Sequence, residues 1–324
     1  MTRAGLTERE IIAILTKQFS AKPRLPLGFD DDVAALPSKR RELFVLKSDM
    51  LVGKTDVPPG MTLRQAARKA VVATISDFAA KGVQPKALLI ALGLASPVRP
   101  RTVNQIAQGL LEGAREYDCR IVGGDTSQTN DLIIDCIGFG LADPGKILRR
   151  DGARPGDIVA VTGDFGKTSA GLKILLSRAK PTTRKYQALV RSITHPVARL
   201  TTGLKLAQTQ SVNSSIDSSD GLAWSLHEIA RINHVDIVLE TIPVAREVRT
   251  FASTEKLNPE ELALFGGEEY ELVVTIKKSR FEKVQKTIPS LRRIGRVEKG
   301  HGEVWTITGN KTRRVEPRGY QHFS

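Results

Sequence analysis

The chain has 324 residues, a net charge of +14, and a composition that is 40% hydrophobic and 26% charged. This size allows two domains with separate buried cores, and the composition is that of a soluble, globular protein. No apolar run reaches the roughly 18 residues that a membrane span needs, and acidic residues near the start replace the apolar core of a signal peptide. We therefore expect a cytoplasmic protein with no membrane partner.

The excess of basic residues raises the question of nucleic-acid binding, because clustered Lys and Arg attract phosphate. Here the basic residues are mostly interspersed with acids, with local concentrations at Arg178–Arg191 and Lys311–Arg318, and only 5% of the chain is aromatic. Aromatic platforms on which single strands stack are therefore not evident. We expect a solvated basic surface and no nucleic-acid partner.

The cysteines and histidines indicate neither a redox centre nor a zinc site. Cys119 and Cys136 are the only cysteines. Their spacing leaves a disulfide open, but two unpaired thiols in a reducing cytoplasm are the favoured interpretation. The five histidines are scattered and lack the spacing of zinc ligands.

The first half of the chain predicts helices and strands in a mixed order. Leu6–Phe19 has apolar residues at helical spacing, and Leu43–Leu46 reads as a short strand that leads into Ser48 and Asp49. Thr62 suits the N-cap of a long helix that runs to Lys81. The elements expected after it are a strand at Ala87–Leu94, a helix at Thr102–Glu116, and strands at Arg120–Val122 and Leu132–Gly140.

The long helix carries one carboxylate within a stripe of small residues. Ala66, Ala70, Ala73, Asp77 and Ala80 follow steps of three and four, which puts them on one face. Small residues let a neighbouring element pack closely, and an unpaired charge in such a place is costly. We therefore expect Asp77 to meet a cation or a set of hydrogen-bond donors.

The Pro-Gly break at Asp143–Gly145 is the best candidate for a joint between two domains, residues 1–145 and 146–324. The elements expected beyond it are strands at Asp157–Thr162, Ser215–Asp217, Ile237–Leu239, Glu271–Ile276, Ile294–Val297 and Val304–Ile307, and helices at Thr168–Leu176 and Leu222–Arg231. This order predicts an α/β (α+β) fold. A mixed N-terminal sheet is expected to have helices on one face, and a C-terminal α/β domain to follow it.

Several acids lie in short segments flanked by glycine. The central one, Ile121–Thr126, reads I-V-G-G-D-T and suits a turn at the end of a strand, because glycine accepts positive φ. Taken singly, each acid has a structural explanation, such as capping its own backbone. The acids next to strand ends or on the packed helix face are Asp31, Asp49, Asp77, Asp125, Asp217 and Asp220.

If these segments converge, the carboxylates repel one another unless divalent cations lie among them. Ligands that offer only oxygen favour Mg²⁺ over zinc, and Mg²⁺ is commonly held together with phosphates. The pattern therefore indicates metal-dependent phosphoryl transfer. The chain has no Walker-type loop, no Rossmann fingerprint in the right context and no kinase catalytic loop, so phosphates must be held in another way.

Seven segments occur in a fixed order: G-F-D-D-D-V-A-A-L, K-S-D-M-L-V, I-S-D-F-A-A-K-G-V-Q-P, V-G-G-D-T, R-D-G-A-R-P-G-D, I-D-S-S-D-G-L and G-G-E-E-Y-E-L. Together they resemble the thiamine-monophosphate kinase family of the aminoimidazole ribonucleotide synthetase superfamily, over nearly the whole chain from Gly28. The resemblance implies direct transfer of the γ-phosphoryl group of ATP to thiamine monophosphate. Because the acceptor is a phosphate oxygen, no strong general base is required. It also implies a homodimer that forms through the first domain, with the active site along the junction.

The resemblance implies roles for individual residues as well. The implied Mg²⁺ ligands are Asp31, Ser48, Asp49, Asp77, Asp125, Asp217 and Asp220. The residues implied to contact the nucleotide are Gly124, Asp125, Arg150 and Ser219, with Arg150 as a donor fork for phosphate oxygens. Asp56, Glu268 and Tyr320 fall where the thiamine part is held, and Tyr320 would contact a cationic thiazolium ring.

Four positions depart from the usual pattern of the family: Asp30 stands where glycine is frequent, Glu269 replaces an aspartate, and Lys47 and Asp56 differ as follows. Lys47 stands where a hydroxyl residue is common, so one metal site is expected to be weaker or replaced by an ammonium group. Asp56 stands where many members have a histidine that contacts substrate.

Two alternative functions stay open. One is another ATP-using member of the superfamily, such as aminoimidazole ribonucleotide synthetase, selenophosphate synthetase or the hydrogenase-maturation enzyme. The other is a nonenzymatic basic protein that binds nucleic acid.

Overall fold

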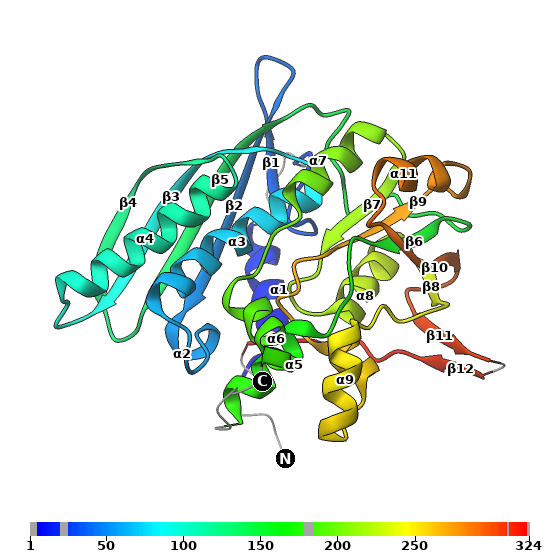
Figure 1. Cartoon of the computed structure of the whole chain (residues 1–324). Helices are drawn as coiled ribbons and strands as arrows, with labels where there is room; N and C mark the ends of the chain where they lie inside the picture. Colours follow the sequence, from blue (N-terminus) through cyan, green and yellow to red (C-terminus); the bar gives the residue numbers. More distant parts are fainter. Residues whose placement is uncertain (1–4, 20–24, 178–183, 310, 323–324) are drawn as a thin grey trace.

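The computed structural model describes residues 5–19, 25–177, 184–309 and 311–322. Within these residues the chain forms two β-sheets, each with helices packed on it (Figure 1). The two-sheet, mixed α/β architecture predicted from the order of the elements is therefore confirmed. None of the helices in the described parts of the chain has the combined length and apolarity needed to cross a membrane.

The first sheet has five strands in the order β1-β2-β5-β3-β4. Its strands are β1 (Ala34–Pro37), β2 (Leu43–Val52), β3 (Pro85–Ala95), β4 (Arg120–Thr129) and β5 (Ile133–Ala142). β3 and β4 are parallel and the other neighbours are antiparallel, so the sheet is mixed, as predicted.

Helices α3 (Leu63–Lys81) and α4 (Pro100–Glu116) lie on one face of this sheet, which we call the covered face (Figure 1). α3 begins where the sequence predicts. The Thr62 hydroxyl accepts a hydrogen bond from the Gln65 N–H, and the Gln65 side chain accepts one from the Thr62 N–H, which is a capping box. Gly82 ends the helix in the left-handed conformation.

The opposite face of the first sheet, which we call the open face, has no helix packed on it in the described residues. Because side chains alternate along a strand, residues on β2 such as Val45 and Leu51 are buried on the covered face, while their neighbours point to the open face. The exposed apolar residues of the open face are Leu36, Phe44, Leu46, Met50, Leu89 and Leu141. Such a patch is typical of a surface that meets another protein.

The second sheet has seven strands in the order β12-β11-β8-β10-β6-β9-β7. Its strands are β6 (Ile158–Val161), β7 (Val212–Asp217), β8 (Val235–Leu239), β9 (Leu272–Ile276), β10 (Arg292–Lys299), β11 (Val304–Thr308) and β12 (Lys311–Arg314). The accompanying helices are α5 (Lys167–Leu176), α6 (Arg184–Thr194), α7 (Leu200–Thr209), α8 (Leu222–Asn233), α9 (Arg246–Glu255), α10 (Pro259–Phe265) and α11 (Phe281–Thr287). The sequence patterns predict α5 and α8 but not the other five.

One of the hydrophobic clusters spans both halves of the chain, while two others each lie within one half. Ile75 on α3, Leu206 on α7 and Val274 on β9 belong to a single buried cluster. Packing within this cluster therefore fixes the position of α3 relative to α7 and β9. The described strands of the first sheet end at Ala142 and those of the second begin at Ile158, while the exact domain boundary stays a prediction.

Two local expectations have different outcomes. The turn expected at Ile121–Thr126 is wrong, because these residues lie inside β4. Glycine is needed at position 124 because the β3 backbone approaches closely. A Cβ at this position would lie 1.8 Å from the carbonyl oxygen of Ile90 on β3. The expectation of unpaired thiols is confirmed, since Cys119 and Cys136 are both free and buried.

Candidate functional site

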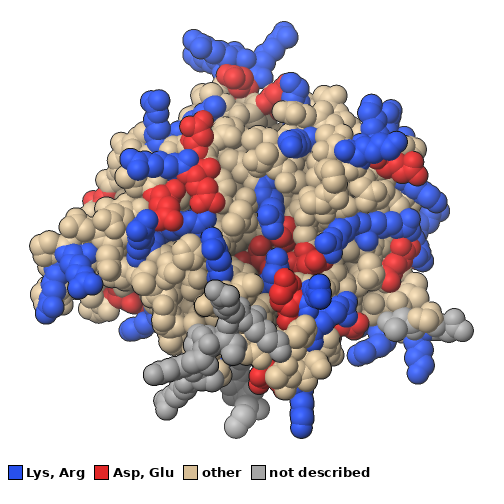
Figure 2. Space-filling model, in the orientation of Figure 1, with Lys and Arg blue, Asp and Glu red and all other residues tan. Residues whose placement is uncertain are grey.

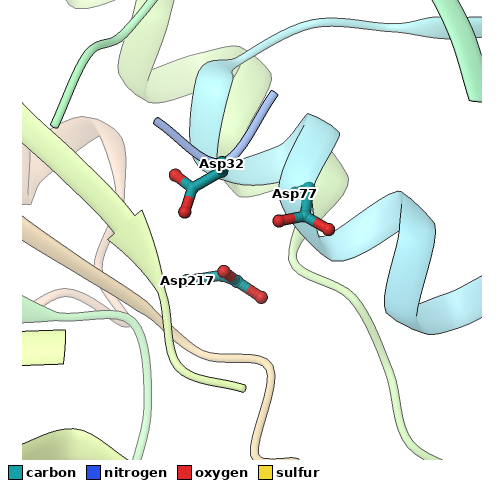
Figure 3. Close-up of side chains that lie close together, drawn as sticks. All are labelled: Asp32, Asp77 and Asp217. Carbon is teal, nitrogen blue, oxygen red and sulfur yellow. The ribbon is translucent and has the colours of Figure 1, made fainter. Parts of the chain in front are cut away.

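Three carboxylates from distant parts of the sequence meet between the two sheets. Asp32 lies in the loop before β1, Asp77 on α3, and Asp217 at the end of β7, and their side chains point toward one another (Figure 3). One carboxylate oxygen from each lies within 4.8 Å of the others, and all three residues are buried. Figure 2 shows acidic side chains gathered near the middle of one face, with basic side chains on both sides of them. We call Asp32, Asp77 and Asp217 the acidic cluster.

A buried lysine neutralises one side of the acidic cluster. Lys81, at the end of α3, is fully buried, and its Nζ lies 2.5 Å from Asp31 Oδ1 and 2.6 Å from Asp32 Oδ2. The same ammonium donates a hydrogen bond of 2.9 Å to the carbonyl oxygen of Ser215 on β7. Lys81 therefore connects helix α3, the loop before β1 and strand β7 of the second sheet at one point.

Arg150 binds the same loop from the other side. Its guanidinium donates from Nε to Asp32 Oδ1 at 2.8 Å and also forms an ion pair with that carboxylate, and its backbone N–H donates to Asp31 Oδ2 at 3.2 Å. Burial by itself would raise the pKa of Asp32, but Arg150 and Lys81 outweigh it, so the pKa lies below the usual range. Asp32 is therefore ionised, and Arg150 is held in a defined orientation beside the cluster.

Lys47, on the covered face of β2, pairs with the second acid of the cluster. Its Nζ lies 3.0 Å from Asp77 Oδ2. Burial would lower the pKa of Lys47, but Asp77 and Asp49 raise it above the usual value, so the side chain is an ammonium. Burial raises the pKa of Asp77 well above its usual value despite this lysine, and Asp217 and Asp49 add to the rise.

Asp217 and Asp220 have no ammonium or guanidinium ion pair in the described residues. The Ser76 hydroxyl donates a 2.6 Å hydrogen bond to Asp217 Oδ2. Burial raises the pKa of Asp217 to about 6, and burial together with Glu8 raises the pKa of Asp220 to about 7. Both carboxylates would therefore gain from a cation placed near them.

The structure places the remaining implied metal ligands on two sides of the first sheet. Asp49 lies on the covered face with Lys47, near Asp77. Ser48 and Asp125 point to the open face, where the Ser48 hydroxyl donates to Asp135 Oδ1 at 2.7 Å. Within one chain, Ser48 and Asp125 are thus separated from the acidic cluster by the sheet.

The donor set of the acidic cluster fits Mg²⁺. This ion prefers oxygen ligands at about 2.0–2.1 Å, so two oxygens on opposite sides of it lie about 4 Å apart. The oxygens of Asp32, Asp77 and Asp217 lie within 4.8 Å of one another, which is close to that spacing. Among the described residues no nitrogen or sulfur ligand joins the cluster, and the buried acids with raised pKa values gain most from a divalent cation.

Two cavities adjoin at the loop that carries Ser219 and Asp220. The larger, of about 690 Å³, is lined by Arg150, Asp217 and Trp224, and α1 (Glu8–Phe19) borders it. The smaller, of about 240 Å³, is lined by the substrate-binding candidates Asp56, Glu268 and Tyr320, and by Lys47, Asp49 and Asp77. Ser219, Asp220 and Tyr320 line both cavities. The structure therefore brings most of the implied residues to two neighbouring spaces.

The smaller cavity is built from loops held to one another by backbone hydrogen bonds. The Glu268 N–H donates to the Ser219 carbonyl at 2.6 Å, and the Tyr320 N–H donates to the Asp220 carbonyl at 2.9 Å. Lys69 forms an ion pair with Glu268, and its Nζ also donates to the Asp56 carbonyl at 2.8 Å. The short helix α2 spans Gly53–Asp56. The side chain of Asp56, its last residue, accepts a hydrogen bond from the N–H of Val52, the residue before its start.

The sequence reasoning missed three residues of the site: Asp32, Lys69 and Lys81. Asp32 is the third acid of D-D-D, and no local sequence pattern distinguishes it from its neighbour Asp31. Lys81 follows Asp77 by four residues, a spacing that places both on one side of α3. That spacing was available in the sequence as a signal.

Comparisons with known proteins agree with this arrangement. A family model described as AIR synthase related protein, N-terminal domain, matches residues 30–142. The thiamine-monophosphate kinase of Nitrosopumilus maritimus (strain SCM1) is 35% identical over 322 residues, which covers 98% of this chain and 99% of that protein. The thiamine-monophosphate kinase of Pyrococcus abyssi is 38% identical, covering 99% of this chain and 97% of that protein. A solved structure of AaThiL complexed with AMPPCP and TMP has a TM-score of 0.88 at 30% identity, and covers 98% of this chain and 97% of that chain.

Proposed function

The chain belongs to the thiamine-monophosphate kinase family, and on that premise we propose that it transfers the γ-phosphoryl group of ATP to thiamine monophosphate, giving thiamine diphosphate and ADP. The observation that supports this best is the position of the acidic cluster beside two adjoining cavities. Two phosphorylated ligands can approach each other there across the loop of Ser219 and Asp220. We expect the reaction to take place in the cytoplasm.

In this proposal Asp32, Asp77 and Asp217 hold Mg²⁺, which, when bound, neutralises phosphate oxygens. Asp31, Asp49 and Asp220 surround the cluster and are further candidate ligands. The chain's own contribution is mainly positioning, since the accepting phosphate oxygen is already a nucleophile. Burial of the cluster also strengthens each electrostatic contact.

The two cavities suggest separate roles for the residues that line them. Arg150 is held against Asp32, and its guanidinium lies beside the larger cavity, where it can donate to nucleotide phosphates. Ser219 lies at the border of both cavities. Asp56, Glu268 and Tyr320 border the smaller one, where a thiamine group would lie near the Tyr320 ring and two carboxylates.

We further propose that the chain forms a homodimer through the open face of the first sheet. The apolar residues exposed on that face support this arrangement. Ser48, Gly124 and Asp125 lie on β2 and β4 of the same sheet, with Ser48 and Asp125 on its open face. A partner covering that face would bring these two polar residues into an enclosed junction between the two copies of the chain.

The direct test is incubation of the protein with thiamine monophosphate, ATP and Mg²⁺, with thiamine diphosphate and ADP measured as products. Preference for thiamine as the acceptor, with the monophosphate inert, would overturn the substrate assignment. Asp125→Asn should keep the fold, seen by circular dichroism, and abolish Mg²⁺-dependent ATP use. Asp118→Asn is the matched control, because Asp118 is an exposed acid in the turn before β4. Full activity in Asp125→Asn would count against its assignment as a metal ligand.

A further inference from the structure

The position of Lys47 has a consequence for the number of metal ions that the site needs. Lys47 is on β2, with its side chain on the covered face and only 25% exposed, and its Nζ lies 3.0 Å from Asp77 Oδ2. Lys47, Asp49 and Asp77 line the smaller cavity together. The ammonium therefore lies at the edge of the acidic cluster that faces the proposed acceptor.

The ammonium and a divalent ion would compete for the same oxygen. Asp32 already has Lys81 and Arg150 as partners, and Asp217 accepts from the Ser76 hydroxyl. Asp77 pairs with Lys47. A Mg²⁺ ion bound to Asp77 Oδ2 from the cavity side would need to lie about 2.1 Å from that oxygen. Two cations cannot share this side of the carboxylate without strong mutual repulsion.

We propose that the Lys47 ammonium is a built-in cation of the active site and takes the place of one divalent ion between Asp49 and Asp77. This inference rests on the proposed use of Mg²⁺ by the acidic cluster. The second oxygen of Asp77 stays available to a Mg²⁺ ion held with Asp32 and Asp217. An ammonium has three N–H donors, so Lys47 can pair with Asp77 and still donate to a phosphate oxygen in the smaller cavity.

Metal binding by variants tests the proposal without relying on turnover. Mn²⁺, a paramagnetic substitute for Mg²⁺, is titrated into the metal-free protein with AMPPCP present, and bound and free ions are separated by electron paramagnetic resonance. Lys47→Ser removes the ammonium and supplies an oxygen ligand, so this variant should bind about one more Mn²⁺ per chain than the wild type. Lys47→Arg keeps the positive charge and should bind the wild-type number. Lys54→Ser, a lysine exposed on α2, is the matched control.

Thermal melting gives a second measurement. In EDTA, Lys47→Ser should melt at least about 5 °C below the wild type, because Asp77 and Asp49 lose their neighbouring cation, and Mg²⁺ should restore most of the difference. If Lys47→Ser folds only with Mg²⁺ while Lys47→Arg folds without it, the proposal is supported as well. Equal Mn²⁺ counts for wild type and Lys47→Ser, with equal melting responses to Mg²⁺, overturn it. Failure of the thiamine-monophosphate assay would instead overturn the proposed function and leave the ion counts unchanged.

Discussion

Replacing Lys81 with methionine should strongly destabilise the protein and disorganise its site. The side chain is fully buried, lies 2.5 Å from Asp31 and 2.6 Å from Asp32, and donates to the Ser215 carbonyl at 2.9 Å. Methionine keeps a similar length but removes the charge and the donors. Because one partner of a buried ion pair is lost while the carboxylates remain, we expect a cost of about 3–5 kcal/mol in the free energy of unfolding.

Urea unfolding followed by circular dichroism at pH 7 measures this cost. Lys146→Met is the matched control, since the ion pair of Lys146 with Asp143 spans 3.5 Å between two exposed side chains and should contribute at most about 1 kcal/mol. A loss from Lys81→Met no larger than that of the control would refute the reasoning.

The pH dependence provides a further check on the Lys81 prediction. The pKa of Asp32 is lowered in the folded protein. Its stabilising contribution is therefore present above its unfolded-state pKa of about 3.9 and is lost as the pH falls through the lower folded value. The difference between wild type and Lys81→Met should accordingly narrow below about pH 4.

Three other predictions follow from the described contacts. Gly124→Ala should lower stability by about 1–3 kcal/mol in urea unfolding, because its Cβ would meet the Ile90 carbonyl oxygen at 1.8 Å; Gly123→Ala, where the nearest atom is 3.4 Å away, should cost less. The pKa of Asp217 is raised to about 6, so stability gained by its protonation is lost as the pH rises through 6. In EDTA, the melting temperature should therefore fall as the pH rises from about 4 to 7. Mg²⁺ should reverse this trend. A pH dependence of the melting temperature that is the same with and without Mg²⁺ would contradict the metal site. Leu89→Glu on the open face should yield monomers in light scattering, whereas Val103→Glu, an exposed position on α4, should not; an unchanged mass for Leu89→Glu would exclude the open face as the dimer interface.

Local sequence patterns predict several of the elements that carry the site. The Thr62 cap and the helical spacing through Lys81 identify α3, because both signals depend only on near neighbours. The expectation that Asp77 meets a cation also agrees with its pairing with Lys47. The apolar runs of β2, β3 and β5 predicted the core of the mixed first sheet, whereas β1 was not expected and β4 was expected only over Arg120–Val122.

Features that depend on distant contacts were harder to predict. The glycines before Asp125 suggest a turn by local propensity, but the close approach of β3 explains Gly124 within a strand. The sequence predicts Asp31 as a ligand and not Asp32, because only the positions of Lys81 and Arg150 show that Asp32 enters the cluster. The separation of Ser48 from Asp49 follows from strand alternation, once the strand is known to continue past Leu46.

Helix α3 carries functional side chains at two distant points of its length. Lys69 near its start reaches Glu268, and Lys81 at its end reaches Asp32. With a rise of 1.5 Å per residue, twelve residues separate these points by about 18 Å along the axis. Deleting or inserting a single residue between them would shorten or lengthen this spacing and turn one end by about 100° relative to the other. Length changes during evolution should therefore accumulate in the surface loops of this chain and be absent between Lys69 and Lys81.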